Sequence, residues 1–236
     1  MEEDLSFREE QNAIYEKVAK KAVENISKRG INASFASNGE EALGAVMDMI
    51  PEDVTVGTAD SATLVQIGIF SALRKRGRNN IINPFLRDEK GYLLVDGEER
   101  QEIMRRALLS DVFVIGTNAV TLDGKLVNID GNGNRVAAMI FGPKKVIIVA
   151  GANKIVKDVD AAIKRVREYC APRNVIRHGT KHHRIEFMDI PCAKTGICVD
   201  CRHPLRICQY TTIIEGAMGA NRGRMNVILV GEELGL

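Results

Sequence analysis

Hydrophobic positions recur at helical spacing in some segments and form short continuous runs in others, and the two kinds of segment alternate along the chain. Helical spacing predicts helices over about 7–29, 37–50, 65–76, 98–109 and 157–169. Short apolar runs predict buried strands at 54–57, 81–83, 111–116, 143–149 and 225–230. This alternation is typical of an α/β fold with a mostly parallel sheet and helices on both faces.

Polar residues follow the first of these strands, at the edge where parallel sheets usually bind ligands. Ser61 and Thr63 can donate hydroxyl hydrogen bonds to a carboxylate or phosphate, and the next helix offers free backbone amides. Gly57, which precedes this turn, is the third candidate substrate-binding residue here. The same residues fit a plain turn in which Asp60 or Ser61 caps the helix, so the sequence leaves both readings open.

A second polar segment, 117–134, follows the buried strand at 111–116. Asp123 and Gly124 predict a hairpin between two short extended pieces. A polar stretch of this length favours a ligand pocket, although Asn, Asp and Gly are also common in ordinary turns. Its candidate substrate-binding residues are Asn118, Asp123, Asn128, Asp130 and Asn134. Neither segment contains a glycine-rich nucleotide motif between strand and helix, so a nucleotide cofactor is not indicated.

Four cysteines lie within seventeen residues, and they are the candidate metal ligands: Cys192, Cys198, Cys201 and Cys208. The central Cys-x2-Cys pair recurs in both iron–sulfur and zinc sites. The compact array favours an iron–sulfur cluster, with a 4Fe-4S cluster expected, over a structural zinc ion or no metal. Ligation by three cysteines would leave one iron open to substrate, whereas four ligands favour electron transfer or a structural role.

The remaining cysteine and the nearby histidines are interpreted as structural or solvent-exposed residues. Cys170 stands apart from the other cysteines and is expected to be buried in a helix. His182 and His183 have charged neighbours that predict a solvated loop, and His203 is interpreted as a surface histidine.

The composition of the chain changes after Cys170, where prolines, histidines and cysteines accumulate. We expect residues 171–223 to leave the main sheet as a cysteine-rich, metal-binding excursion, and the strand at 225–230 to close the sheet. The whole chain, 1–236, is thus predicted to be a single α/β domain that begins with helices over 1–50.

Charge and hydropathy exclude several classes of partner. The 33 basic and 31 acidic residues leave a net charge of only +2, so nucleic-acid binding is not expected. No apolar run approaches the roughly 20 residues of a membrane helix, and the charged N-terminus lacks the apolar core of a signal peptide. These features predict a cytoplasmic protein without membrane contact, in which the thiols stay reduced and available for metal.

Residues 116–156, GTNAVTLDGKLVNIDGNGNRVAAMIFGPKKVIIVAGANKIV, closely resemble the LUD domain family, which is named for lactate utilisation and was formerly a domain of unknown function. The closing segment RMNVILVGEELGL and the turn at 56–68 also fit. The resemblance implies a fold like that of the sugar-phosphate isomerase and CoA-transferase superfamily, with a Rossmann-like sheet. It also implies a link to the oxidation of lactate to pyruvate, beside iron–sulfur partners.

The cysteine segment departs from the usual family pattern. The lactate-utilisation subunit that consists of the LUD domain alone typically lacks such an array, and its larger partner carries Cys-x2-Cys-x2-Cys motifs that are absent here. The chain therefore resembles a short LUD branch with its own segment PCAKTGICVDCRHPLRIC, whose reaction the resemblance does not define.

Three hypotheses follow. The first is an iron–sulfur protein of small hydroxy- or oxo-acid metabolism, an oxidoreductase or lyase whose cluster transfers electrons or binds substrate at an open iron. The second is a non-catalytic accessory subunit with a structural zinc or iron–sulfur site. The third, CoA transfer or sugar-phosphate isomerisation, rests on analogy of fold alone. The expected partners are a small carboxylate substrate and an iron–sulfur or flavin redox protein, and oligomer formation is left open.

Overall fold

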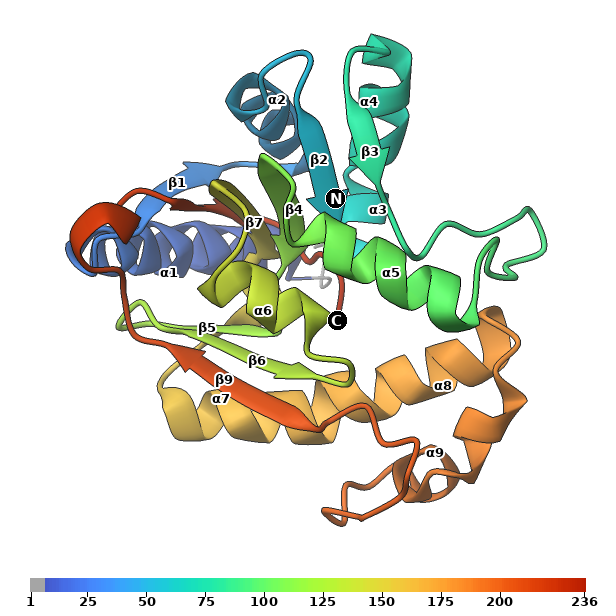
Figure 1. Cartoon of the computed structure of the whole chain (residues 1–236). Helices are drawn as coiled ribbons and strands as arrows, with labels where there is room; N and C mark the ends of the chain where they lie inside the picture. The colour runs from blue at the N-terminus through green and yellow to red at the C-terminus, as the bar shows by residue number, and fades with distance from the viewer. Residues whose placement is uncertain (1–6) are drawn as a thin grey trace, which may run out of the picture.

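Six parallel strands form the central sheet of the computed structural model, which describes residues 7–236 (Figure 1). Neighbouring strands pair in parallel throughout this sheet. Their order is β1 (Asn32–Ala36), β10 (Met225–Val230), β7 (Lys145–Gly151), β4 (Val112–Gly116), β2 (Thr55–Thr58) and β3 (Asn80–Ile82). The last strand thus inserts between the first strand and the central one, and the expected parallel α/β architecture is confirmed.

Helices cover both faces of this sheet. Successive residues of its buried strands point to opposite sides, and because both kinds are apolar, both faces must be covered. In β7, Val146 and Ile148 pack with one set of helices, whereas Ile147 and Val149 pack with the other. The first set comprises α1 (Arg8–Lys28), α5 (Gly97–Ala107) and α6 (Asn134–Ile140). The second set comprises α2 (Gly39–Met49), α3 (Ala62–Gln66) and α4 (Ile69–Arg76).

A second, four-stranded sheet lies beside the first set of helices. Its order is β8 (Ile155–Val156), β5 (Ala119–Thr121), β6 (Leu126–Asp130) and β9 (Tyr210–Ile214). The antiparallel pairing of β5 with β6 confirms the hairpin predicted at Asp123 and Gly124. Gly124 is required there, because its φ is 93° and a Cβ would lie 2.6 Å from the backbone of Asn25.

The segment after β8 packs against the outer face of this second sheet. It contains α7 (Val159–Arg165), a π-helical turn at Val166–Cys170, α8 (Ala171–Lys181) and α9 (Pro191–Thr195). Short 3-10 turns stand at Ile185–Asp189, Gly219–Asn221 and Ala152–Lys154. In Figure 1, α8 and α9 lie on the same side of the molecule as β9, away from α2 and α4.

Local details of the N-terminal half differ from the sequence-based expectations. The region predicted to be helical over 1–50 contains strand β1 between its two helices, and its residues 1–6 lie outside the described residues. Helix α2 begins one residue later than predicted, because Asn38 is its cap and accepts a hydrogen bond from the Glu41 amide at 2.9 Å. The helix predicted over 65–76 is divided at Gly68, whose φ of 78° starts a new helix.

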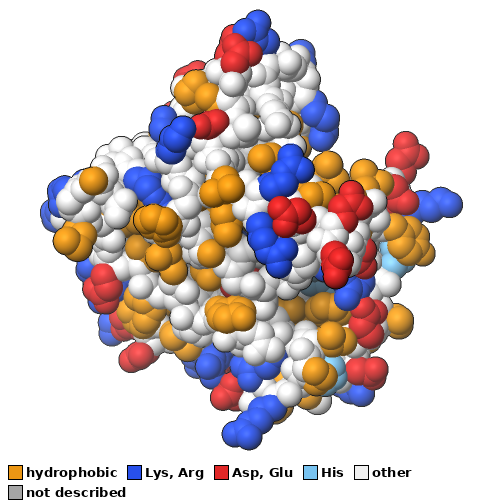
Figure 2. All heavy atoms as spheres, in the orientation of Figure 1, with side chains coloured by type: hydrophobic (Ala, Val, Ile, Leu, Met, Phe, Trp, Pro, Cys, Tyr) orange, Lys and Arg blue, Asp and Glu red, His pale blue; other side chains and the backbone are white. Residues whose placement is uncertain are grey.

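Within residues 7–236, no helix combines the length and hydrophobicity needed to cross a membrane. Basic, acidic and hydrophobic side chains are interspersed over the face shown in Figure 2, as the small net charge predicts. The charge is distributed very differently inside the molecule, at the carboxyl ends of the central strands.

Candidate functional site

A cavity of about 370 Å³ opens where β2, β4 and β7 end. Its walls come from the turns after these strands, from the β6–α6 connection, from α8 and from the loop at 204–209. This is the edge at which parallel α/β sheets usually bind ligands, and the volume is typical of a small-molecule site. Five of the eight candidate substrate-binding residues line the cavity: Ser61, Thr63, Asn118, Asp130 and Asn134.

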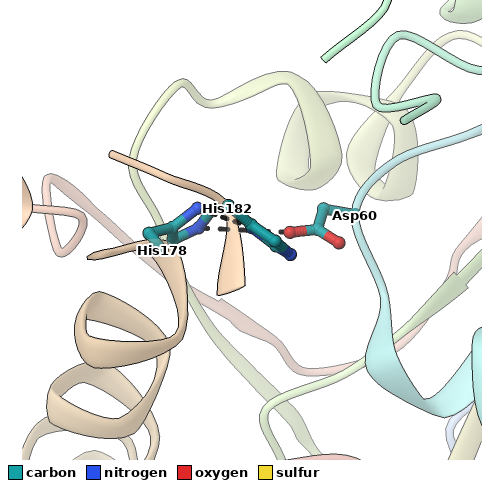
Figure 3. Close-up of side chains that lie close together, drawn as sticks. All are labelled: Asp60, His178 and His182. Atoms are coloured by element: carbon teal, nitrogen blue, oxygen red, sulfur yellow. Dashed lines mark hydrogen bonds and ion pairs between the residues drawn. The ribbon is translucent and has the colours of Figure 1, made fainter. Parts of the chain in front are cut away.

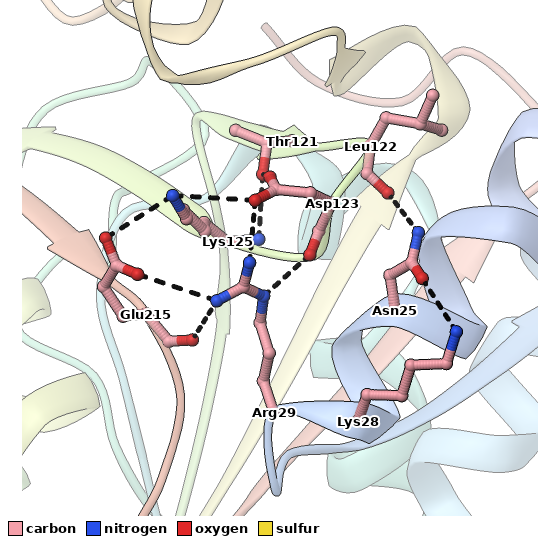
Figure 4. A network of polar contacts seen from close by, with 8 residues as sticks. All are labelled: Asn25, Lys28, Arg29, Thr121, Leu122, Asp123, Lys125 and Glu215. Atoms are coloured by element: carbon pink, nitrogen blue, oxygen red, sulfur yellow. Dashed lines mark hydrogen bonds and ion pairs between the residues drawn. The ribbon is translucent and has the colours of Figure 1, made fainter.

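The other three candidate residues lie outside the cavity lining, and their contacts are structural. Gly57 lies within β2, where a Cβ would come within 2.5 Å of the Ser110 hydroxyl and 2.7 Å of the Ala107 carbonyl oxygen. Asp123 lies in the hairpin turn, where its carboxylate accepts a hydrogen bond from Arg29 at 2.7 Å (Figure 4). This contact joins the hairpin to the end of α1 rather than to the cavity.

Asn128 supports the cavity wall from behind. Its Oδ1 accepts hydrogen bonds from the Thr117 hydroxyl at 3.1 Å, the Asn118 amide at 3.2 Å and Arg135 at 2.5 Å. Arg135 also donates to Asn118 Oδ1 at 2.8 Å and to the Ile129 carbonyl at 2.7 Å. This buried network fixes Asn118 and Arg135 in place. Asn128 thus holds two residues of the cavity lining although it does not line the cavity itself.

The cavity is strongly cationic. Its lining includes two carboxylates, Asp60 and Asp130, and seven cationic side chains: Arg87, Arg100, Arg135, Lys154, Arg177, Arg184 and Arg206. Among the described residues, five of the seven cations have a carboxylate within 4.0 Å, and Arg87 and Lys154 have none. Two uncompensated cations inside a cavity attract an anionic ligand.

Lys154 is the most unusual of these cations, because its side chain is buried in the cavity wall just beyond β7. The residue is 4% exposed, and its Nζ donates to the Thr63 hydroxyl at 2.9 Å and to the Thr117 carbonyl at 3.2 Å. Burial lowers the pKa of Lys154 to about 7. The amine is therefore able to anchor an anion when charged and to accept a proton when neutral.

Two histidines and one carboxylate meet at the edge of the cavity formed by α8 (Figure 3). His178 Nδ1 lies 3.1 Å from His182 Nδ1, and His178 Nε2 lies 4.0 Å from Asp60 Oδ2. Burial, reinforced by Arg177, lowers the pKa of His178 to about 3 and that of His182 to about 4, so both rings are neutral. The prediction of a solvated loop is therefore wrong for His182, whereas His183 is exposed.

The four predicted metal ligands surround a second, much smaller cavity of about 20 Å³. Cys192 lies in α9, and Cys198, Cys201 and Cys208 lie in the loop that follows it. The four cysteines line this one cavity, and burial together with the nearby thiols of the other three raises the pKa of Cys192. Cys170 does not line this cavity; it is buried against β5 and β6 beside Arg165 and lines the large cavity.

Arg206 joins the two cavities. Its guanidinium donates hydrogen bonds to the Cys201 carbonyl and to Asp200, and its side chain lines both the cysteine cavity and the large cavity. Ile207 and Ala171 likewise line both cavities. The cysteine site and the cationic cavity thus share a wall of three residues.

Comparison with protein families matches residues 19–230 to the model of the LUD domain. The chain belongs to the LUD domain family. This LUD domain is similar in fold to a DUF162 family protein from Deinococcus radiodurans, at 14% identity and a TM-score of 0.49, over 92% of this chain and 97% of that chain. It is also similar to eIF2B delta from Chaetomium thermophilum, at 18% identity and a TM-score of 0.30, over 48% of this chain and 46% of that one. None of the curated proteins matches it.

Sequence reasoning missed the residues that give the LUD domain cavity its charge. Arg87, Lys154 and Arg177 come from separate parts of the chain, and only Lys154 lies in the segment 116–156 that resembles the LUD domain family. Its position was a second signal, since Lys154 closely follows the most hydrophobic predicted strand, at the edge where ligands bind. For Asp60 and Ser61, the structure selects Ser61 as the cap of α3, with its hydroxyl accepting from the Leu64 amide at 3.4 Å.

Proposed function

We propose that this LUD domain protein binds an iron–sulfur cluster through Cys192, Cys198, Cys201 and Cys208, and a small hydroxy- or oxo-acid in the adjacent cationic cavity. The observation that carries the proposal is the shared wall, in which Arg206 lines both the cysteine cavity and the anion cavity.

The cysteine segment fits a cluster in its donor set and its surroundings. Four thiols around one cavity are sufficient for a 4Fe-4S cluster, and all four are half-buried. Arg167 and Arg206 line the same cavity, so their positive charge would offset the negative charge of a ligated cluster. A bound cluster supplies a route for single electrons or, with an iron that no cysteine ligates, a Lewis acid.

The side chains of the large, cationic cavity provide the groups that would bind the small acid. In our proposal the carboxylate binds to charged Lys154 and to the hydroxyls of Ser61 and Thr63, and Asn118 completes the site. Lys154 lacks a carboxylate partner among the described residues, so an incoming anion relieves the cost of burying its charge. Oxidation of a hydroxy acid to the oxo acid releases two electrons and two protons. The electrons would pass to an iron–sulfur or flavin redox partner, and the protons to solvent.

A second candidate function is supported by a different observation. Ile197 and Val199, which flank Cys198, are 66% and 61% exposed. Apolar side chains beside a metal site suit docking to another protein, so a non-catalytic accessory subunit with a structural zinc or iron–sulfur site is the alternative.

Binding of pyruvate and lactate to the anaerobically purified protein separates the two candidates. We expect calorimetry to detect both acids and the cluster absorption to change when they bind. Lys154→Met should weaken the binding of both acids at least about 10-fold, because it removes one charged hydrogen bond to the carboxylate. Lys164→Met, at an exposed position of α7, is the matched control and should bind normally. A protein with its full cluster that binds neither acid would contradict the first candidate and favour the accessory subunit.

A further inference from the structure

The proposed function leaves Asp60, His178 and His182 without a role. One ring nitrogen from each histidine and one carboxylate oxygen lie within 4.8 Å of one another (Figure 3). The two Nδ1 atoms are 3.1 Å apart. Two imidazole nitrogens that bind one tetrahedral Zn²⁺ at about 2.0–2.1 Å are separated by about 3.3 Å, so the rings are already at chelating distance.

The secondary structure places these ligands by ordinary rules. His178 and His182 are four residues apart at the end of α8, so they lie on the same face of the helix. Asp60 comes from the turn after β2, at the carboxyl edge of the central sheet. Two histidines at this spacing together with a carboxylate from another element are a common donor set for divalent transition metals.

The arginine beside Asp60 leaves one carboxylate oxygen available. Arg177 donates to Asp60 Oδ2, which is also the oxygen nearest His178. Among the described residues, the hydrogen bond to this carboxylate goes to Oδ2 and none goes to Oδ1. The carboxylate can therefore keep Arg177 on one oxygen and bind an ion through the other, an arrangement that orients many metal ligands.

The surrounding charge determines what else such an ion must bind. Arg87 and Arg184 line the same cavity, so a divalent ion would add to an environment that is already positive. An anionic ligand that reaches the ion would remove this penalty. His178 and Asp60 both line the cavity, so the open coordination positions of an ion would be accessible to a bound acid.

We propose that Asp60, His178 and His182 bind a divalent transition-metal ion, and that a 2-hydroxy or 2-oxo acid chelates this ion through its carboxylate and α-oxygen. The metal site stands on the three side chains alone, whereas the class of chelating ligand rests on the proposed function. Because the acid offsets the local positive charge, the ion and the acid bind cooperatively, each strengthening the binding of the other.

Cobalt(II) is the probe for the site, because its visible spectrum reports the ligand atoms. We expect the anaerobic, cluster-containing protein to bind one Co²⁺ per chain with weak bands typical of nitrogen and oxygen ligands, without the near-ultraviolet bands of cobalt–thiolate bonds. His178→Gln and His182→Gln should each weaken this binding at least about 10-fold. His183→Gln is the matched control, because His183 is the exposed neighbour and should leave the affinity unchanged.

Addition of pyruvate tests the second part of the proposal and should tighten Co²⁺ binding. Iron and sulfide content, measured on the same samples, shows independently whether the cysteine site and the fold are intact. Equal Co²⁺ binding by the wild type and both His→Gln variants, or no binding by any of them, would overturn the metal site. Binding that pyruvate does not tighten would overturn the chelation, and failure of the cysteine cluster alone would leave the metal site supported.

Discussion

Replacement of Lys154 by methionine should make the protein more stable at neutral pH, although it removes two hydrogen bonds. Lowering the pKa of a lysine from 10.5 to about 7 corresponds to about 4 kcal/mol of unfavourable free energy at pH 7, since each tenfold change in affinity is about 1.4 kcal/mol. The hydrogen bonds to Thr63 and Thr117 are worth about 1 kcal/mol each. The net gain from Lys154→Met is therefore about 2 kcal/mol.

The pH dependence identifies the source of this gain. The pKa of Lys154 is lower in the folded state, so between about pH 7 and pH 10.5 the unfolded state holds more protons. The wild-type stability should then rise with pH, by about 3 kcal/mol between pH 7 and pH 9.5, as the penalty declines. The corresponding rise is absent from Lys154→Met. The lowered pKa values of His178 and His182 change the free energy of unfolding only below about pH 6.5, and they do so in both proteins.

Anaerobic urea titrations of wild type and Lys154→Met at several pH values would provide the measurement, with iron content checked in each sample. The quantity of interest is the difference in unfolding free energy between the two proteins, because titrating groups that do not interact with Lys154 cancel in it. Parallel pH curves for wild type and variant, or a variant less stable than wild type at pH 7, would refute the reasoning about the buried amine.

Three further predictions concern packing, the hairpin and the shared wall. Gly57→Ala should lower stability by about 1–3 kcal/mol in urea titrations, because its Cβ meets the Ser110 hydroxyl, whereas Gly44→Ala, with open space around it in α2, should raise stability by up to about 1 kcal/mol. The reverse order would contradict the packing described here. Asp123→Ala should lower the melting temperature but leave pyruvate affinity in calorimetry unchanged, and a loss of affinity would place this turn in the site. Arg206→Met should lower the reduction potential of the cluster in an electrochemical titration and weaken pyruvate binding, and an effect on only one of these would argue against the shared wall.

The parallel sheet was predictable because its inner strands are continuous aliphatic runs, which few other structures accommodate. Strand β1 escaped prediction because it lies at the edge of the sheet and has the sequence NASFA, with only Ala36 fully buried. Asn32 and Ser34 alternate with Ala33 and Phe35, but a pattern this short with one large apolar side chain is too weak to predict a strand, and the pairing with β10 defines it as one. The break at Gly68 was equally hidden, because a single glycine within an apolar pattern is tolerated in a helix.

The site was predictable where local sequence determines position. Ser61 and Asn118 follow buried strands directly, and strand ends meet at one edge of a parallel sheet. The same logic failed for Asp123, because the hairpin carries that residue away from the edge and toward α1. Arg87 and His178 reach the cavity only through tertiary packing of segments about 90 residues apart, which no local pattern records.

The iron and acid-labile sulfide content of anaerobically purified protein tests the central claim most directly, measured for wild type, each of the four Cys→Ser variants and Cys170→Ser. We predict about four irons and four sulfides per chain in the wild type. Cys192→Ser, Cys198→Ser and Cys201→Ser should lose the cluster, and Cys170→Ser should retain it, because Cys170 does not line the cysteine cavity. Retention in Cys208→Ser would indicate an open iron beside the cavity. Zinc without sulfide, or iron that depends on Cys170, would contradict the account.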